Sequence, residues 1–228
     1  MLIHGGLVLL LLGQLTTDFL QTESSMRLRE GQSLNYSQDF RRAELAVIDT
    51  TDPEHDLVSV IPDRVLARNE RVAVPDMPFT VRVVHYWRNS TNVPPARVTT
   101  PSPANRGLGE QVQFAEAPLE TDPNRRNVPA AYIELLAKDA SLGVWLVSEW
   151  LDRPQALNHQ GRSYEIALRP VRYYKPFYLE LLNFSHDKYM GTEIPKNFSS
   201  RVRVLRPDTG EDREVLIYMN HPLRYGGE

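Results

Sequence analysis

The chain has 228 residues, of which 41% are hydrophobic and 24% are charged, and its formal net charge is −3. These values are those of a folded protein with a sizeable core, and the slight negative charge provides no basic field that would attract nucleic acid. The absence of cysteine excludes thiolate catalysis, disulfide exchange, cysteine-based zinc sites and covalent haem attachment through C-x-x-C-H.

The N-terminal segment is strongly apolar, because residues 2–15 are interrupted only by His4 and Gln14. A helix over them is about 21 Å long, whereas a bilayer core is about 30 Å thick. The helix therefore spans only if residues 16–20 or upstream residues extend it. We predict a short, truncated membrane helix over 1–20. A signal peptide is the alternative, but the segment has neither a basic start nor a small-residue cleavage site.

His4 is the candidate functional residue of this helix. An ionisable side chain in an apolar helix is costly and suggests a function by default. Neutral imidazole can ligate haem iron through one ring nitrogen. The alternative is a histidine at the membrane–water boundary, with its ring among the lipid headgroups. The spacing alone leaves both interpretations open.

The body of the chain, 21–228, alternates apolar and polar residues with a period of two from about Ala43. This pattern is typical of antiparallel strands with one buried face. Turn residues at 158–161 and 206–211 predict hairpin loops. We therefore predict a mainly β fold, an antiparallel sandwich or open barrel of about ten short strands. The expected strands are 43–49, 56–61, 79–87, 130–137, 142–150, 164–169, 177–184, 201–204 and 214–219.

Residues 89–127 contain six prolines but little alternation. We expect a long, loose loop between two β subdomains. Loops of this length are often where partners bind, although plain disorder explains the composition equally well.

The body contains no recognisable catalytic motif, and we expect no enzymatic activity. Turn sequences surround His55 and His159, which predicts solvated surface rings. His85 lies among the apolar residues of its strand, which predicts a core or interface position. His186 and His221 are expected in turns. None of them has metal-ligand spacing.

Residues 169–178 form the densest basic and aromatic run of the chain. Such a run suits lipid headgroups, haem propionates or a protein partner. The simpler interpretation is a strand edge with solvated cations. Pro170 and Pro176 fit an edge, since proline cannot donate a hydrogen bond to a neighbouring strand.

Three stretches, 3–14, 174–200 and 215–225, resemble the ResB family, which is called CcsB in related systems. The resemblance implies a component of the System II machinery for cytochrome c assembly. Such a component works with a CcsA/ResC-like membrane partner. Together they move haem outward across the bacterial cytoplasmic (inner) membrane and present it to apocytochrome c. The β body would then be extracytoplasmic, or periplasmic.

The resemblance also implies a role for His4, which occupies the position of a family histidine that acts as an axial haem ligand. The cofactor would be a non-covalent haem b, and the partner would supply the second ligand. The family's earlier and final membrane helices are absent, so we expect a piece of a longer protein. Two other classes stay open: a membrane-tethered β module that binds a protein or envelope polymer without haem, and a periplasmic hydrolase.

Overall fold

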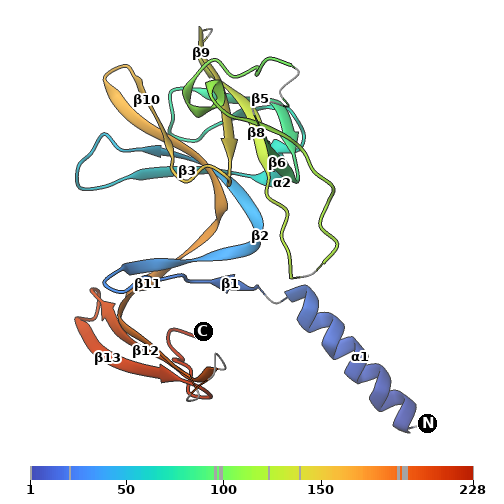
Figure 1. The fold of residues 1–228 in the computed structure, drawn as a ribbon, viewed down its shortest axis with the longest axis vertical. Coiled ribbons are helices and arrows are strands. Elements are labelled where there is room, and N and C mark those ends of the chain that lie inside the picture. The colour runs from blue at the N-terminus through green and yellow to red at the C-terminus, as the bar shows by residue number, and fades with distance from the viewer. Residues whose placement is uncertain are drawn as a thin grey trace. The chain divides into compact units, whose positions relative to one another are not determined.

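The computed structural model describes residues 2–20, 22–94, 97, 100–122, 124–138, 140–188, 191 and 195–227. Most of these residues lie in antiparallel strands, and one longer helix precedes them (Figure 1). The predicted mainly β, antiparallel fold with a short N-terminal helix is confirmed. The strands are less uniform than expected, because β2 and β11 are 17 and 27 residues long.

The helical elements are α1 (Leu2–Leu20), α2 (Asp63–Leu66) and the 3-10 helix η2 (Gly107–Glu110). The strands are β1 (Ser24–Ser25), β2 (Ser33–Asp49), β3 (Leu57–Pro62), β4 (Arg71–Ala73), β5 (Thr80–Trp87), β6 (Ser90–Val93), β7 (Gln113–Glu116), β8 (Ala130–Ala137), β9 (Ala140–Ser148), β10 (Gln155–His159), β11 (Arg162–Lys188), β12 (Pro195–Arg206) and β13 (Glu211–Tyr218). One sheet has the order β1-β2-β11-β12-β13, with β3 on β2 and β10 on β11. The others are β4-β5-β8-β9 and the pair β6-β7.

The chain divides into two compact units. Unit 1 consists of residues 1–39 and 172–228, and unit 2 consists of residues 40–171. Strands β2 and β11 therefore each contribute to both units.

Unit 2 encloses the main hydrophobic core. Its buried side chains come from β2, β3, β10 and β11 on one side and from β5, β8 and β9 on the other. Tyr164 packs edge-on against Phe79, with 5.3 Å between the ring centroids. The predicted turn at 158–161 is confirmed, because Gln160 and Gly161, both with positive φ, connect β10 to β11. Two successive residues with positive φ match the right-handed twist of the two strands in a hairpin.

A β-bulge in β5 changes the face on which its residues lie. Val83 pairs with Ile133, but the next pair is His85 with Tyr132, so Val84 is an extra residue. An extra residue reverses the alternation beyond it. His85 is consequently exposed, not buried in the core as its sequence position suggested.

Segment 89–127 is more ordered than its proline content predicted. Its described residues include β6, η2 and β7, and they lie inside unit 2 rather than between the units. Phe114 of β7 is buried in a second, smaller core beside Tyr132. Asn89 connects the two ends of the loop between Pro118 and Val128. Its side-chain amide donates to the Pro118 carbonyl and accepts from the Val128 N–H. These contacts join residues with no regular spacing, so a periodic sequence pattern does not reveal them.

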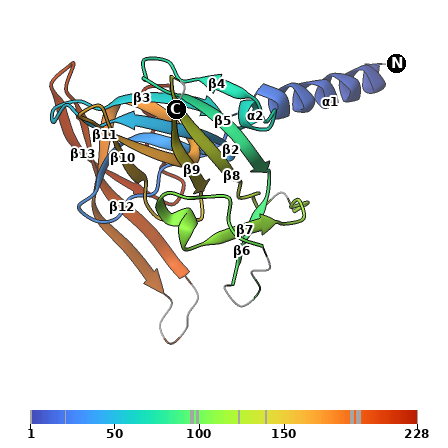
Figure 2. The same cartoon turned by 90° about the horizontal axis from the view of Figure 1, so that it is seen from above.

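Unit 1 contains the three-stranded ladder β11-β12-β13. Strands β12 and β13 lie side by side as the hairpin predicted at 206–211 (Figure 2). Strand β11 continues through Pro170 and Pro176 because neither residue is paired with β10 or β12. Strand β10 pairs with β11 up to Ile166, and β12 pairs with it from Tyr178. The prolines thus occupy a local edge.

The N-terminal helix α1 is confirmed over residues 2–20. Its leucines are solvent-exposed, as shown by Leu7, Leu9 and Leu10, which are 57%, 71% and 67% exposed. Within the described ranges, no helix has both the length and the apolarity needed to cross a membrane. The truncated membrane helix predicted over 1–20 is therefore present as a helix but not as a membrane span.

Candidate functional site

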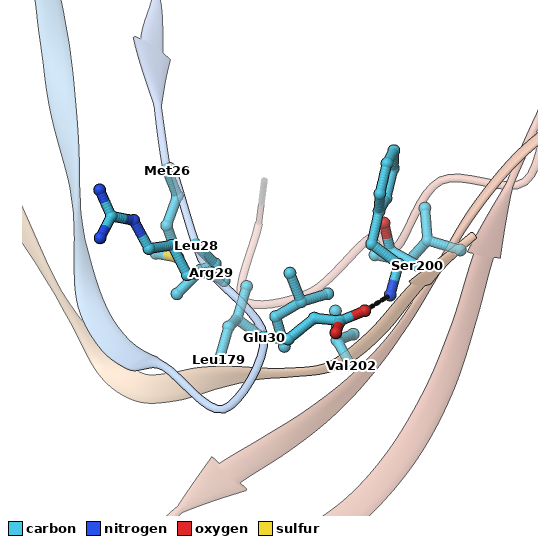
Figure 3. Close-up of a pocket in the computed structure, with 10 residues that line it drawn as sticks. Met26, Leu28, Arg29, Glu30, Leu179, Ser200 and Val202 are labelled. Atoms are coloured by element: carbon cyan, nitrogen blue, oxygen red, sulfur yellow. Dashed lines mark hydrogen bonds between the residues drawn. The ribbon is translucent and has the colours of Figure 1, made fainter. Parts of the chain in front are cut away.

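Unit 1 has an apolar groove of about 690 Å³ on one face of its ladder (Figure 3). Ten residues line it, and seven of them have apolar side chains. They are Met26, Leu28, Arg29, Glu30, Leu179, Leu181, Phe184, Ser200, Val202 and Ile217.

The register of the strands explains why these side chains share a face. Leu179 and Leu181 of β11 are opposite Val204 and Val202 of β12. Residues directly opposite each other in a ladder point to the same side of the sheet. The floor of the groove is therefore a continuous apolar surface, with Leu181, Val202 and Val204 buried.

The segment 26–30 forms the opposite wall of the groove. It is fastened to β11 by two backbone bonds, from Gly31 N to Leu181 O at 2.7 Å and from Leu181 N to Gln32 O at 3.1 Å. A β-bulge follows Leu181, where the register with β12 shifts. The carboxylate of Glu30 accepts a 2.7 Å hydrogen bond from the backbone N–H of Phe184, just beyond the bulge.

One end of this face is covered and the other is open. The ring of Tyr225 packs edge-on against buried Phe177 with 4.8 Å between centroids, and its hydroxyl donates to Glu211. At the other end, Phe184 is 48% exposed and Phe198 is 41% exposed. Large exposed apolar side chains beside a groove are typical of a surface that recognises another molecule.

Two histidines of unit 1 lie on aromatic rings. His186 belongs to β11, not to a turn as predicted, and stacks on Phe198 with 4.5 Å between ring centroids. His221 follows a turn, as predicted, and stacks on Tyr218 at 4.1 Å. Both side chains are exposed. Each could present an imidazole nitrogen to a partner.

The remaining histidines do not converge on one site. His4 is exposed on α1, and His55 is exposed just after a bend. His159 is half-buried at the end of β10, so the prediction of a solvated ring in a turn is wrong for this residue. In the part of the chain that the structure describes, no group of three or more His, Cys, Asp or Glu residues could hold a metal ion. His4 lies on an apolar helix, with Leu7, Val8 and Leu11 as its neighbours along the helix.

The basic and aromatic run 169–178 is mostly engaged within the protein rather than solvated. Arg169 is buried and donates from Nε to Glu44 at 3.0 Å. The Arg172 guanidinium lies over the ring of Tyr36, 4.2 Å from its centroid. Because cations of this run have partners in the chain, the interpretation as an edge of solvated cations is only partly correct.

Sequence reasoning missed the groove. Its floor was visible as alternation in β11 and β12, but its wall comes from a short segment with no regular structure. The only signal there was the alternation of Met26 and Leu28 around a polar residue. The bonds that hold this segment link residues about 150 positions apart, which no local pattern reports.

The fold and the groove define a mainly β protein of two units with an apolar surface that is suited to binding another molecule. Residues 155–228 match the model of the ResB-like family. This part of the chain, which contains β10 to β13 and most of the groove floor, is therefore ResB-like. No curated protein matches the chain.

Proposed function

We propose that this protein is a component of the machinery that assembles c-type cytochromes, and that it handles haem and polypeptide without catalysing a reaction. The observation that carries the proposal is the ResB-like match over residues 155–228. The body would lie on the outer side of the bacterial cytoplasmic membrane, where a CcsA/ResC-like partner completes the machinery. The exposed apolar helix α1 supports a location at the membrane surface or among partner helices.

His4 is the residue that we propose as an axial haem ligand. The exposed imidazole can supply one nitrogen, and the apolar side chains beside it suit the rim of a porphyrin. The other five histidines lie in the β body, so the partner supplies the second ligand. Haem is bound non-covalently, because the chain has no cysteine to form a thioether bond.

The haem ligand is tested by replacing His4 with Ala in the full-length protein, co-expressed with its CcsA/ResC-like partner. We expect the purified complex to lose haem and to change its absorption spectrum. His55→Ala is the matched control, because His55 is also exposed but lies in the body. An unchanged haem content and spectrum in His4→Ala would rule out the ligand role.

The groove of unit 1 is proposed to receive an extended segment of apocytochrome c. Strand β13 ends the path of its sheet, so among the described residues no further strand pairs with its outer edge, which could accept an added strand. Glu211 to Glu214 place charges along the first half of that edge, whereas Val215 to Tyr218 are mostly apolar. A chain added beside the second half would place alternate side chains near the groove, which fits an unfolded polypeptide.

Binding of apocytochrome c tests this role of the groove. The double variant Phe184→Ser and Phe198→Ser removes two exposed rings, and we expect binding of a fluorescently labelled apocytochrome to weaken at least tenfold. Val84→Ser is the control, because Val84 is 41% exposed in unit 2. Equal binding by the double variant and the control would refute the role.

The competing function is a binding module that recognises a protein or an envelope polymer and never contacts haem. The open groove is compatible with it. Loss of polypeptide binding in the groove variant, combined with normal haem content in His4→Ala, would favour this function.

A further inference from the structure

Unit 2 has a second cavity, of about 370 Å³, with a lining opposite in character to that of the groove. Every lining residue is polar or charged, and four of them are arginines. The residues are Arg41, Arg88, Glu120, Thr121, Asp122, Arg125, Arg126 and Asn127. We call it the arginine cavity.

The lining contains only two carboxylates beside its four arginines, so it retains a positive charge. The side chain of Asp122 caps its own turn by accepting the backbone N–H of Asn124 at 2.8 Å. Glu120 lies at 3.9 Å from the Arg125 guanidinium, a distance at which an exposed ion pair contributes little. Arg88 is exposed, and no ion pair or hydrogen bond of its side chain is found among the described residues.

Arg126 connects the lining of the cavity to a buried carboxylate. Its Nη2 atom lies 2.7 Å from Oε2 of Glu149, whose side chain is only 4% exposed. The Arg126 side chain remains 34% exposed, so part of its guanidinium is available to solvent and to a ligand. An arginine that is positioned by a buried acid and still accessible is suited to binding an anion.

The loop between Pro118 and Val128, which supplies six of the eight lining residues, is held by defined contacts. Asn89 is 7% exposed and bonds both Pro118 and Val128, at the two ends of the loop. Asn127 accepts the backbone N–H of Glu120 at 2.9 Å across the loop. The arginines are therefore presented on an organised frame, which reduces the entropy lost when a ligand binds.

We propose that the arginine cavity binds a small, soluble dianion with carboxylate or phosphate groups, held chiefly by Arg88, Arg125 and Arg126. Guanidinium groups that surround one cavity repel each other, and an anion between them relieves this repulsion. Arginine matches the geometry of carboxylate and phosphate with paired hydrogen bonds. The volume of the cavity excludes a macromolecular ligand from its interior.

The test uses the full chain, with inorganic phosphate and succinate as separate probes in isothermal titration calorimetry. Sodium chloride keeps the ionic strength constant, so that general screening does not imitate binding. We expect saturable binding of at least one probe and at least tenfold weaker binding in Arg88→Met. Arg64→Met is the control, because Arg64 is exposed on α2 outside the cavity, and it should bind as the unchanged protein does.

Arg125→Met provides a second variant if Arg88→Met fails to fold, as judged by circular dichroism. The proposal is overturned if neither probe binds saturably, or if both cavity variants bind as well as Arg64→Met. It is also overturned if Arg88→Met weakens binding to phosphatidylglycerol vesicles while free phosphate does not compete, because the ligand would then be a lipid headgroup.

Discussion

Glu149 makes the stability of unit 2 depend on pH in a direction that is unusual for a carboxylate. It follows β9 directly, and its side chain is 4% exposed. Burial raises the pKa of Glu149 from 4.5 to about 7, although the nearby Arg126 lowers it, and the negative charge of Asp63 raises it slightly further. The folded protein therefore binds this proton more tightly than the unfolded chain does.

The sign of the effect follows from that difference. Between pH 4.5 and about 7, Glu149 is protonated in the folded protein but ionised in the unfolded chain. The free energy of unfolding is thus highest below pH 4.5 for this group and falls as the pH rises toward 7. A difference of roughly 2.5 pKa units corresponds to about 3 kcal/mol at most.

Glu149→Gln removes the titration while preserving the shape of the side chain and an oxygen that can accept from Arg126. We expect the variant to gain stability relative to the unchanged protein as the pH rises from 5 to 8, by up to about 3 kcal/mol. Urea unfolding followed by tryptophan fluorescence at both pH values measures this. Glu116→Gln, an exposed site on β7, is the control. Identical pH dependence in Glu149→Gln and the control would refute the reasoning.

Three further predictions concern contacts that the fold requires. Arg169→Met leaves the carboxylate of Glu44 buried without its partner and should cost about 3–5 kcal/mol of unfolding free energy in urea titrations. Arg203→Met, which breaks an exposed pair with Asp212, should cost much less unfolding free energy than Arg169→Met, and equal losses would contradict this difference. A Cβ at Gly109 would lie 2.5 Å from Ala104 Cβ and 2.7 Å from Leu146 Cβ. Gly109→Ala should therefore lower stability by about 1–3 kcal/mol in the same assay, and an unchanged midpoint would contradict the packing. Asn89→Ala should cost about 1–3 kcal/mol and increase hydrogen exchange at 118–128, whereas Asn92→Ala on β6 should change neither. Exchange that is the same in both variants would show that Asn89 does not hold the loop.

Periodicity predicted the fold class and many of its strands. The strand expected at 130–137 has those bounds in the structure, and its side chains are mostly buried. The two strands expected at 164–169 and 177–184 are instead parts of β11. The sequence placed Pro170 and Pro176 at a strand edge, and the change of partner from β10 to β12 explains why one strand continues through both of them.

The positions of single side chains were less predictable. His85 lay on the apolar side of an ideal strand, but the bulge after Val83 exposed it. The Arg169–Glu44 pair joins residues 125 positions apart, so the burial of that arginine could not be inferred locally. His4 was recognisable because an ionisable residue in an apolar run is conspicuous, whereas the groove depends on a wall that has no periodic pattern.

Covalently bound haem in the c-type cytochromes of the organism that produces this protein is the most direct measure of the proposed role. The account predicts that cells lacking this gene lose the haem-stained cytochrome bands, and that the full-length gene restores them. Normal amounts of haem-bearing cytochrome c in the deletion strain would contradict a role in cytochrome c assembly.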